Sequence, residues 1–140
     1  MTQMCERSLT YNEANSPMWY LTCRHYPAGF INSNLVDFAS FVQACLRYGE
    51  LNGTRILQEE TFRKMLELQN PQSGVSFLWD HYPGGAVGHI GGGTGFSTSV
   101  EWQHGSGTAF FIFTNLYNNS VYHQGRIYEL VKYQSSLSIH

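Results

Sequence analysis

The chain has 140 residues, of which 42% are hydrophobic, 15% aromatic and only 13% charged. This length suggests a single domain with one hydrophobic core, and this composition excludes a disordered chain. The formal net charge of −2 comes without a basic run, which argues against nucleic acid as a partner. Because charge is sparse, we expect apolar surface that a partner or a missing part of the protein would cover.

The three cysteines, Cys5, Cys23 and Cys45, form no Cys-x-x-Cys pair, and their odd number leaves at least one thiol without a partner in the chain. We expect them to be buried as small hydrophobic residues. Residues 1–16 lack the basic region and apolar run of a signal peptide, and no stretch approaches the roughly 18 apolar residues of a membrane helix. The localisation stays open: periplasmic or extracellular if the front of a precursor is missing, otherwise cytoplasmic.

Secondary structure is predicted from residue 34 onward, while residues 1–28 are poorly defined and only 19–23 suggest a short strand. Asn34 suits a helix N-cap, and the Asn52-Gly53 pair is typical of a tight hairpin turn. We expect, in chain order, a helix over 34–49, a hairpin over 50–57, a helix over 59–69, strands over 75–82, 96–102 and 109–113, and a final helix from 118 or 119 to about 133.

These elements predict an α+β fold, with an antiparallel sheet flanked by helices. The segment 96–102 alternates apolar and polar residues, as a strand with one buried face does. The segment 109–113 is continuously apolar, which is typical of a central strand covered on both faces. Three strands would leave open edges, so the predicted sheet is incomplete.

The glycine-rich segment Gly88–Ser97 carries the strongest functional signal. It leads into a strand rather than a helix, which excludes a dinucleotide fingerprint, and no Lys-Ser or Lys-Thr pair follows as in a Walker loop. Glycines beside a strand expose its N–H and C=O groups to an extended, amide-bearing ligand, and one N–H there could form half of an oxyanion hole. The alternative is a flexible turn between strands with a solvated His89.

Three segments, in order and in register, resemble the class C β-lactamase and D-alanyl-D-alanine carboxypeptidase group of serine hydrolases. Residues 27–66, from Pro-Ala-Gly-Phe through Gly-Glu-Leu-Asn-Gly-Thr-Arg-Ile-Leu to Lys-Met-Leu, are similar to one stretch of that group. Gly88–Phe96 is similar to its Gly-His-Gly-Gly-x-x-Gly-Phe signature, and Phe111–Asn115 to its strand ending in Thr-Asn. The resemblance covers roughly residues 27–117. It implies a partial β-lactamase/transpeptidase-like fold and, in the full-length family, amide or ester hydrolysis through an acyl-enzyme.

The resemblance also assigns binding residues. The family carries a Lys/His-x-Gly element on a strand beside its cleft, and His89-Ile90-Gly91 is similar to it. This implies that His89 contacts a substrate carboxylate or the proton network, that Gly91 allows close approach, and that the Gly92 N–H belongs to the oxyanion hole. Ile90 replaces the small hydroxyl residue of the strictest motifs, so a hydroxyl contact is lost while the backbone role remains.

The family's nucleophile is missing from the chain. No serine has a lysine three residues later, because Lys64 and Lys132 follow Thr61 and Glu129 at that spacing. A Tyr-x-Asn is also missing before residue 27, where the family order would place it. We therefore assign no catalytic residue, metal or cofactor. We interpret 29–140 as the C-terminal, substrate-binding portion of a β-lactamase-like domain, inactive alone: a fragment, a split protein or a reduced relative that only binds.

The competing hypothesis is a non-catalytic binding or self-assembly module that uses the open sheet edge. The predicted partners are accordingly a small-molecule or peptide substrate, a second copy or a missing N-terminal half, with no membrane segment. Serine–histidine catalysis and a zinc site are weaker alternatives, because nothing places the groups around one substrate and the spacings match no familiar ligand pattern. Their candidate residues are Ser97, Ser99, Ser106, His81, His89 and His104.

Overall fold

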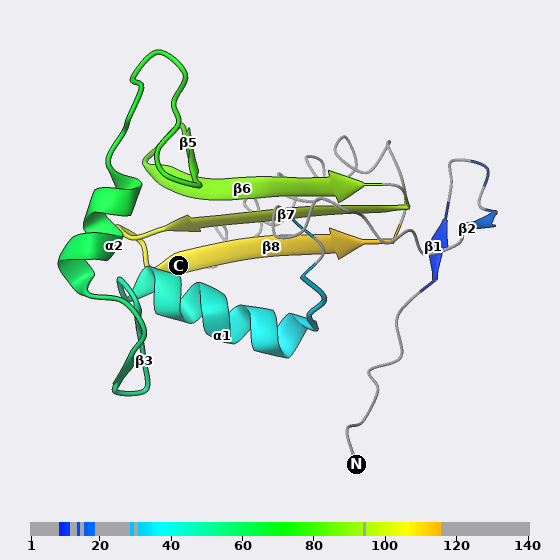
Figure 1. Ribbon diagram of the computed structural model, residues 1–140, viewed down its shortest axis with the longest axis horizontal. Helices are drawn as coiled ribbons and strands as arrows, with labels where there is room; N and C mark the ends of the chain where they lie inside the picture. Colours follow the sequence, from blue (N-terminus) through cyan, green and yellow to red (C-terminus); the bar gives the residue numbers. More distant parts are fainter. Residues whose placement is uncertain are drawn as a thin grey trace, which may run out of the picture. The chain divides into compact units, whose positions relative to one another are not determined.

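The computed structural model describes residues 9–11, 14, 16–18, 29, 31–93 and 95–115. Within these residues it is a mixed α+β structure with antiparallel sheets and two helices, which confirms the predicted fold class (Figure 1). The strand predicted over 19–23 and the final helix lie outside the described residues, as do Cys5 and Cys23. Neither described helix is long and apolar enough to cross a membrane.

Helix α1 (Leu35–Leu46) begins as its sequence predicts. The Asn34 side chain accepts hydrogen bonds from the N–H groups of Val36 and Asp37, both at 2.9 Å. These bonds satisfy two of the free donors that every helix start leaves. The helix ends at Leu46 rather than at Gly49, which instead turns the chain with a φ of +89°.

The short hairpin after α1 follows its turn chemistry. Strands β3 (Glu50–Leu51) and β4 (Thr54–Arg55) pair in antiparallel register, as predicted. Asn52 and Gly53 have φ values of 51° and 80°, the left-handed conformations that a two-residue turn of this kind requires.

Helix α2 (Glu59–Leu66) is shorter than the predicted 59–69. After Leu66 the backbone becomes extended, and the Gln69 N–H donates to the Val75 carbonyl at 3.0 Å. Pro71 disfavours helical backbone at the preceding residue, and the chain turns back there instead of extending the helix.

The strand predicted over 75–82 is wrong for most of its length, because only β5 (Asp80–Tyr82) is a strand. The Ser76 N–H donates to the Trp79 carbonyl at 2.9 Å, so residues 76–79 form a turn. Leu78 has a φ of 72°, and Phe77 and Leu78 are 58% and 70% exposed. Their alternating pattern therefore does not reflect a buried strand face.

The main sheet has four strands in the order β5-β6-β7-β8, where three were predicted. The additional strand is β6 (Ala86–Gly93), which contains most of the glycine-rich segment, and it precedes β7 (Phe96–Gln103) and β8 (Thr108–Thr114). The prediction of a central strand over 109–113 is also wrong for the described sheet, since β8 is its outermost strand and is only partly buried. A separate pair is formed by β1 (Thr10–Tyr11) and β2 (Pro17–Met18).

The described hydrophobic core joins both helices to the sheet. Trp102 is 1% exposed, and its ring meets that of Trp79 edge to face at 4.5 Å between centroids. Helix α1 lies against β8, where the rings of Phe38 and Phe111 meet at 5.3 Å (Figure 1). The buried apolar cluster consists of Val42, Cys45, Phe62, Val87, Val100 and Trp102.

Cys45 has the buried environment that the sequence predicts. It is a free thiol, and burial raises its pKa to about 12. A thiol with such a high pKa stays protonated at neutral pH and acts as a small hydrophobic residue.

The chain divides into two compact units. Unit 1 contains 1–29, 90–99 and 112–140, and unit 2 contains 30–89 and 100–111. Strands β6, β7 and β8 each contribute residues to both units.

Candidate functional site

The three predicted binding residues, His89, Gly91 and Gly92, all lie on β6. Strand β5 pairs with only the first part of β6, and its register ends at Asp80 opposite Gly88. Among the described residues, no strand pairs with this side of β6 beyond that point. Within the described ranges, the second half of β6 is therefore an unpaired edge, which we call the glycine edge and define as Ile90–Gly93.

The register with β5 determines which backbone groups face this open side. The N–H of His81 donates to the Gly74 carbonyl at 2.8 Å, away from β6. His81 and its partner Val87 are therefore a non-hydrogen-bonded pair. Because bonded and non-bonded pairs alternate in antiparallel strands, the next pair, Asp80 and Gly88, is bonded, and the N–H and C=O groups of Gly88 point toward β5. The same alternation along β6 directs the N–H and C=O groups of Ile90 and Gly92 to the side of β5. At these positions no described strand forms hydrogen bonds with them.

Contacts with β7 lead to the same orientation. A Cβ built on Gly93 would lie 2.7 Å from the Phe96 ring, and one on Gly91 would lie 2.5 Å from the Thr98 hydroxyl oxygen. Gly93 is thus opposite Phe96 and Gly91 opposite Thr98, as expected when only two residues join the strands. In a two-residue hairpin, the pair of residues next to the turn is hydrogen-bonded across the two strands. The N–H and C=O groups of Gly93 and Gly91 therefore point toward β7, and those of Gly92 point away from it.

The accessibility of the glycine edge differs from residue to residue. Gly92 is exposed, and a Cβ there would make only an ordinary contact, 3.8 Å from the Phe96 carbonyl oxygen. Gly91 and Gly93 are partly buried. The Thr98 side chain occupies the space where a Cβ on Gly91 would lie, and the Phe96 ring does the same for Gly93. Ile90 is 47% exposed. The outward backbone groups therefore belong to the two more exposed residues of the edge.

His89 precedes the glycine edge on the same strand and is exposed. Its ring meets the Trp79 ring edge to face, with centroids 6.4 Å apart. This contact gives the imidazole an aromatic neighbour on one side and leaves the rest of the ring accessible. A polar or cationic contact to a ligand, as the resemblance implies, is compatible with this placement.

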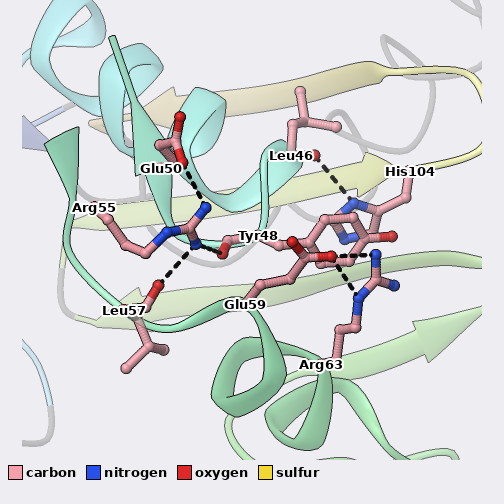
Figure 2. A network of polar contacts seen from close by, with 8 residues as sticks. All are labelled: Leu46, Tyr48, Glu50, Arg55, Leu57, Glu59, Arg63 and His104. Carbon is pink, nitrogen blue, oxygen red and sulfur yellow. Dashed lines mark hydrogen bonds and ion pairs between the residues drawn. The ribbon is translucent and has the colours of Figure 1, made fainter. Parts of the chain in front are cut away.

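A second polar cluster, in unit 2, was not anticipated from the sequence (Figure 2). The His104 ring stacks on Tyr48 at 4.1 Å and 8°, and the Arg63 guanidinium lies 3.7 Å from the centre of the same Tyr48 ring. Arg63 also donates two hydrogen bonds to the Glu59 carboxylate. Tyr48 itself has a φ of 52°, an uncommon conformation for an aromatic residue, which its two stacked neighbours support.

The hydrogen bonds of His104 fix its tautomer. The Trp102 indole N–H donates to Nε2 at 3.1 Å, so Nε2 carries no proton and Nδ1–H donates to the Leu46 carbonyl at 3.3 Å. Burial lowers the pKa of His104 and the charge of Arg63 lowers it further, while the bond to Leu46 opposes them. His104 is therefore a neutral structural residue whose two ring nitrogens are both engaged.

This geometry bears on the weaker catalytic alternatives. His104 has no free nitrogen to act as a base toward Ser106, whose hydroxyl instead contacts Gln103 and Thr108. The Ser97 hydroxyl is buried and has no hydrogen-bond partner among the described residues, and its burial keeps it from a substrate in solution. No group of three or more His, Cys, Asp or Glu side chains within the described ranges is arranged to hold a metal ion.

Comparison with known proteins gives no match: no family model, no curated protein and no solved structure is significantly similar to the chain. The β-lactamase-like resemblance therefore depends on the motifs alone.

Proposed function

We propose that the chain is the substrate-binding portion of a serine β-lactamase-like hydrolase, and that its glycine edge binds an extended amide or ester ligand. The observation that carries the proposal is the outward orientation of the Gly92 N–H and C=O at an exposed, side-chain-free position. An extended ligand can approach such an edge closely and bond to it as an added strand does.

The chain does not carry out the acyl transfer by itself in this proposal. A nucleophilic serine needs an adjacent base, and the chain contains no Ser-x-x-Lys. We expect intact-mass measurement to find no adduct after incubation with benzylpenicillin or a fluorophosphonate. A stoichiometric adduct would show that a nucleophile is present and would contradict this part of the proposal.

Binding is tested by an NMR titration of the ¹⁵N-labelled chain with N-acetyl-D-alanyl-D-alaninamide and, separately, with benzylpenicillin. At least one of the two should shift the amide resonances of the glycine edge in a saturable manner. Saturable shifts confined to other parts of the chain, or no shifts with either compound, would overturn the proposal.

Two substitutions at Gly92 separate the backbone N–H from the local fold. Gly92→Pro removes the N–H, and proline is tolerated at an open sheet edge. Losing one neutral hydrogen bond should weaken binding about 2- to 10-fold. Gly92→Ala keeps the N–H and adds a methyl group where there is room, so its affinity should stay within about twofold. Equal affinities for both variants would exclude this N–H as a ligand contact.

Self-assembly is the second candidate function, because an open edge also invites pairing with another copy of the chain. Native mass spectrometry distinguishes the two functions. A dimer that Gly92→Pro dissociates and Gly92→Ala does not would favour assembly through the glycine edge. A monomer that binds the ligands above would favour substrate binding.

A further inference from the structure

A continuous series of contacts within unit 2 connects the exposed His89 with the half-buried His104. The His89 ring meets the Trp79 ring at 6.4 Å, and the Trp79 ring meets that of Trp102 at 4.5 Å. Both contacts are edge to face, a favoured geometry for aromatic pairs. Trp102 completes the series by donating its indole N–H to His104. These contacts run from the residue next to the glycine edge to the turn that follows β7.

The hydrogen bond between Trp102 and His104 requires the neutral form of the imidazole. Nε2 accepts the indole N–H at 3.1 Å, and Nδ1–H donates to the Leu46 carbonyl at 3.3 Å. Protonation adds a hydrogen to Nε2, so two donors then point at each other. Trp102 is 1% exposed, so water does not reach its N–H to replace the lost acceptor unless the side chain moves.

The charges around His104 oppose its protonation as well (Figure 2). The His104 ring stacks on Tyr48, and the Arg63 guanidinium packs on the same ring, so protonation places two cations beside one aromatic residue. Glu59 accepts two hydrogen bonds from Arg63 and compensates part of that charge. The residue before Tyr48, Arg47, is exposed. The pKa of His104 is lowered, first by burial and then by the charge of Arg63.

Two features allow a displacement of Trp102 to reach His89. Trp102 belongs to the buried apolar cluster, and close-packed side chains change position in discrete steps rather than deforming continuously. The Trp79 indole N–H is buried and has no hydrogen-bond partner among the described residues, so packing determines where this ring lies. A shift of the Trp102 ring therefore changes the position of Trp79 and its contact with His89.

We propose that unit 2 contains a proton-sensitive switch, in which protonation of His104 releases the Trp102 indole and displaces His89 through Trp79. The switch acts within the folded chain, and it is distinct from a loss of overall stability. The coupling between the two histidines does not depend on the proposed function. Its effect on a ligand at the glycine edge does rest on that function.

The coupling is tested by NMR on the ring C–H resonances of the histidines, as the pH of the 140-residue chain is lowered from about 7.5 to about 4.5. The His89 resonances should show two inflections, one from their own protonation and one at the midpoint of His104. A single inflection at His89 overturns the proposal. Unfolding before the second inflection, followed by circular dichroism, also overturns it, because the switch must act in the folded chain.

Two variants identify the source and the path of the second inflection. In His104→Gln, the amide oxygen can accept the Trp102 N–H and the amide N–H can donate to Leu46, so the neutral arrangement is kept without titration. The second inflection at His89 should then be lost. Its persistence would assign it to another group, such as His81, and would overturn the proposal.

Trp79→Phe keeps an aromatic ring but shortens the side chain between Trp102 and His89. The second inflection at His89 should diminish in this variant, while His104 itself still titrates. An undiminished inflection would show that Trp79 does not carry the coupling and would contradict the proposal. This comparison remains decisive if His104→Gln does not fold.

The consequence for the glycine edge is measured with N-acetyl-D-alanyl-D-alaninamide, a ligand without a titrating group. On lowering the pH through the His104 midpoint, its affinity for the unmodified chain should change at least about twofold more than its affinity for His104→Gln. Equal changes would overturn the regulation of the edge. No binding at any pH would instead refute the proposed function, while the NMR titration still decides whether the switch exists.

Discussion

The two halves of strand β6 differ in burial and in pairing. Ala86, Val87 and Gly88 are buried and paired with β5, and Val87 belongs to the buried apolar cluster. The glycine edge that follows lacks a described partner on its outer side and carries one exposed apolar side chain. Glycine has opposite uses in the two halves: at Gly88 it allows close strand packing, and at Gly92 it leaves the backbone open. One continuous strand can thus pack into the core at one end and leave its backbone exposed at the other.

The largest expected effect concerns the buried half and its core. Trp102→Ala removes a fully buried indole, and we expect the free energy of unfolding to fall by about 3–5 kcal/mol. Phe77→Ala is the matched control, because that ring is 58% exposed and its loss should change stability by no more than about 0.5 kcal/mol. Urea unfolding followed by circular dichroism measures both. Similar losses for the two variants would contradict the assignment of the core.

The next prediction compares the two glycines directly. A Cβ at Gly88 would collide with the backbone carbonyl oxygen of Val100, which cannot move aside as a flexible side chain can. Gly88→Ala should therefore destabilise the chain by about 1–3 kcal/mol. Gly92→Ala should change stability by no more than about 0.5 kcal/mol. If Gly92→Ala proved the more damaging substitution in urea unfolding, the division of β6 into a packed and an open half would be wrong.

A smaller effect is expected from pH, through His104. Burial lowers its folded pKa, so between the folded value and the unfolded value of about 6.5 the unfolded chain binds more protons. The stabilisation from neutral His104 is complete above about pH 6.5 and is lost as pH falls toward the folded pKa. The unmodified chain should lose more stability between about pH 7.5 and about pH 5.5 than His104→Gln does. Equal losses in parallel urea titrations would show that His104 is not the group responsible.

The smallest expected effect is that of an exposed ion pair on α2. Glu60 and Lys64 lie one turn apart with an N–O distance of 2.9 Å, and both side chains are largely exposed. Glu60→Gln should lower the free energy of unfolding by about 0.3–0.5 kcal/mol, and this difference should diminish at high salt. A loss near that of Gly88→Ala would mean that α2 charges support the fold far more than solvent screening allows.

Local chemistry explains which parts of the fold could be predicted from the sequence. The Asn34 cap and the Asn52-Gly53 turn are each determined by residues within a few positions, and both are confirmed. The prediction of a strand over the whole of 75–82 is wrong because alternating apolar residues also occur in exposed turns. Here the hydrogen bond from the Ser76 N–H to the Trp79 carbonyl turns the chain instead. The residue pattern alone does not predict β6, because glycine has low strand propensity and shows no alternation, whereas the family resemblance implies a strand at His89-Ile90-Gly91.

The candidate site shows the same division. The placement of His89, Gly91 and Gly92 on one strand follows from their closeness in sequence. The outward direction of the Gly92 backbone depends on pairing registers, which no local pattern determines. The bond between His104 and Leu46 spans 58 residues, so only the folded chain reveals it. The one local signal for that cluster is Trp102, two residues before His104.

The buried thiol of Cys45 supplies the molecule with its own reporter of core opening. Iodoacetamide reacts with a thiolate, and a thiol with a pKa of about 12 on the buried face of α1 offers almost none while the core is closed. Alkylation of Cys45 therefore requires that the core around α1 opens. Peptide mapping separates the label at Cys45 from any at Cys5 and Cys23, and its rate measures the population of the open state without denaturant.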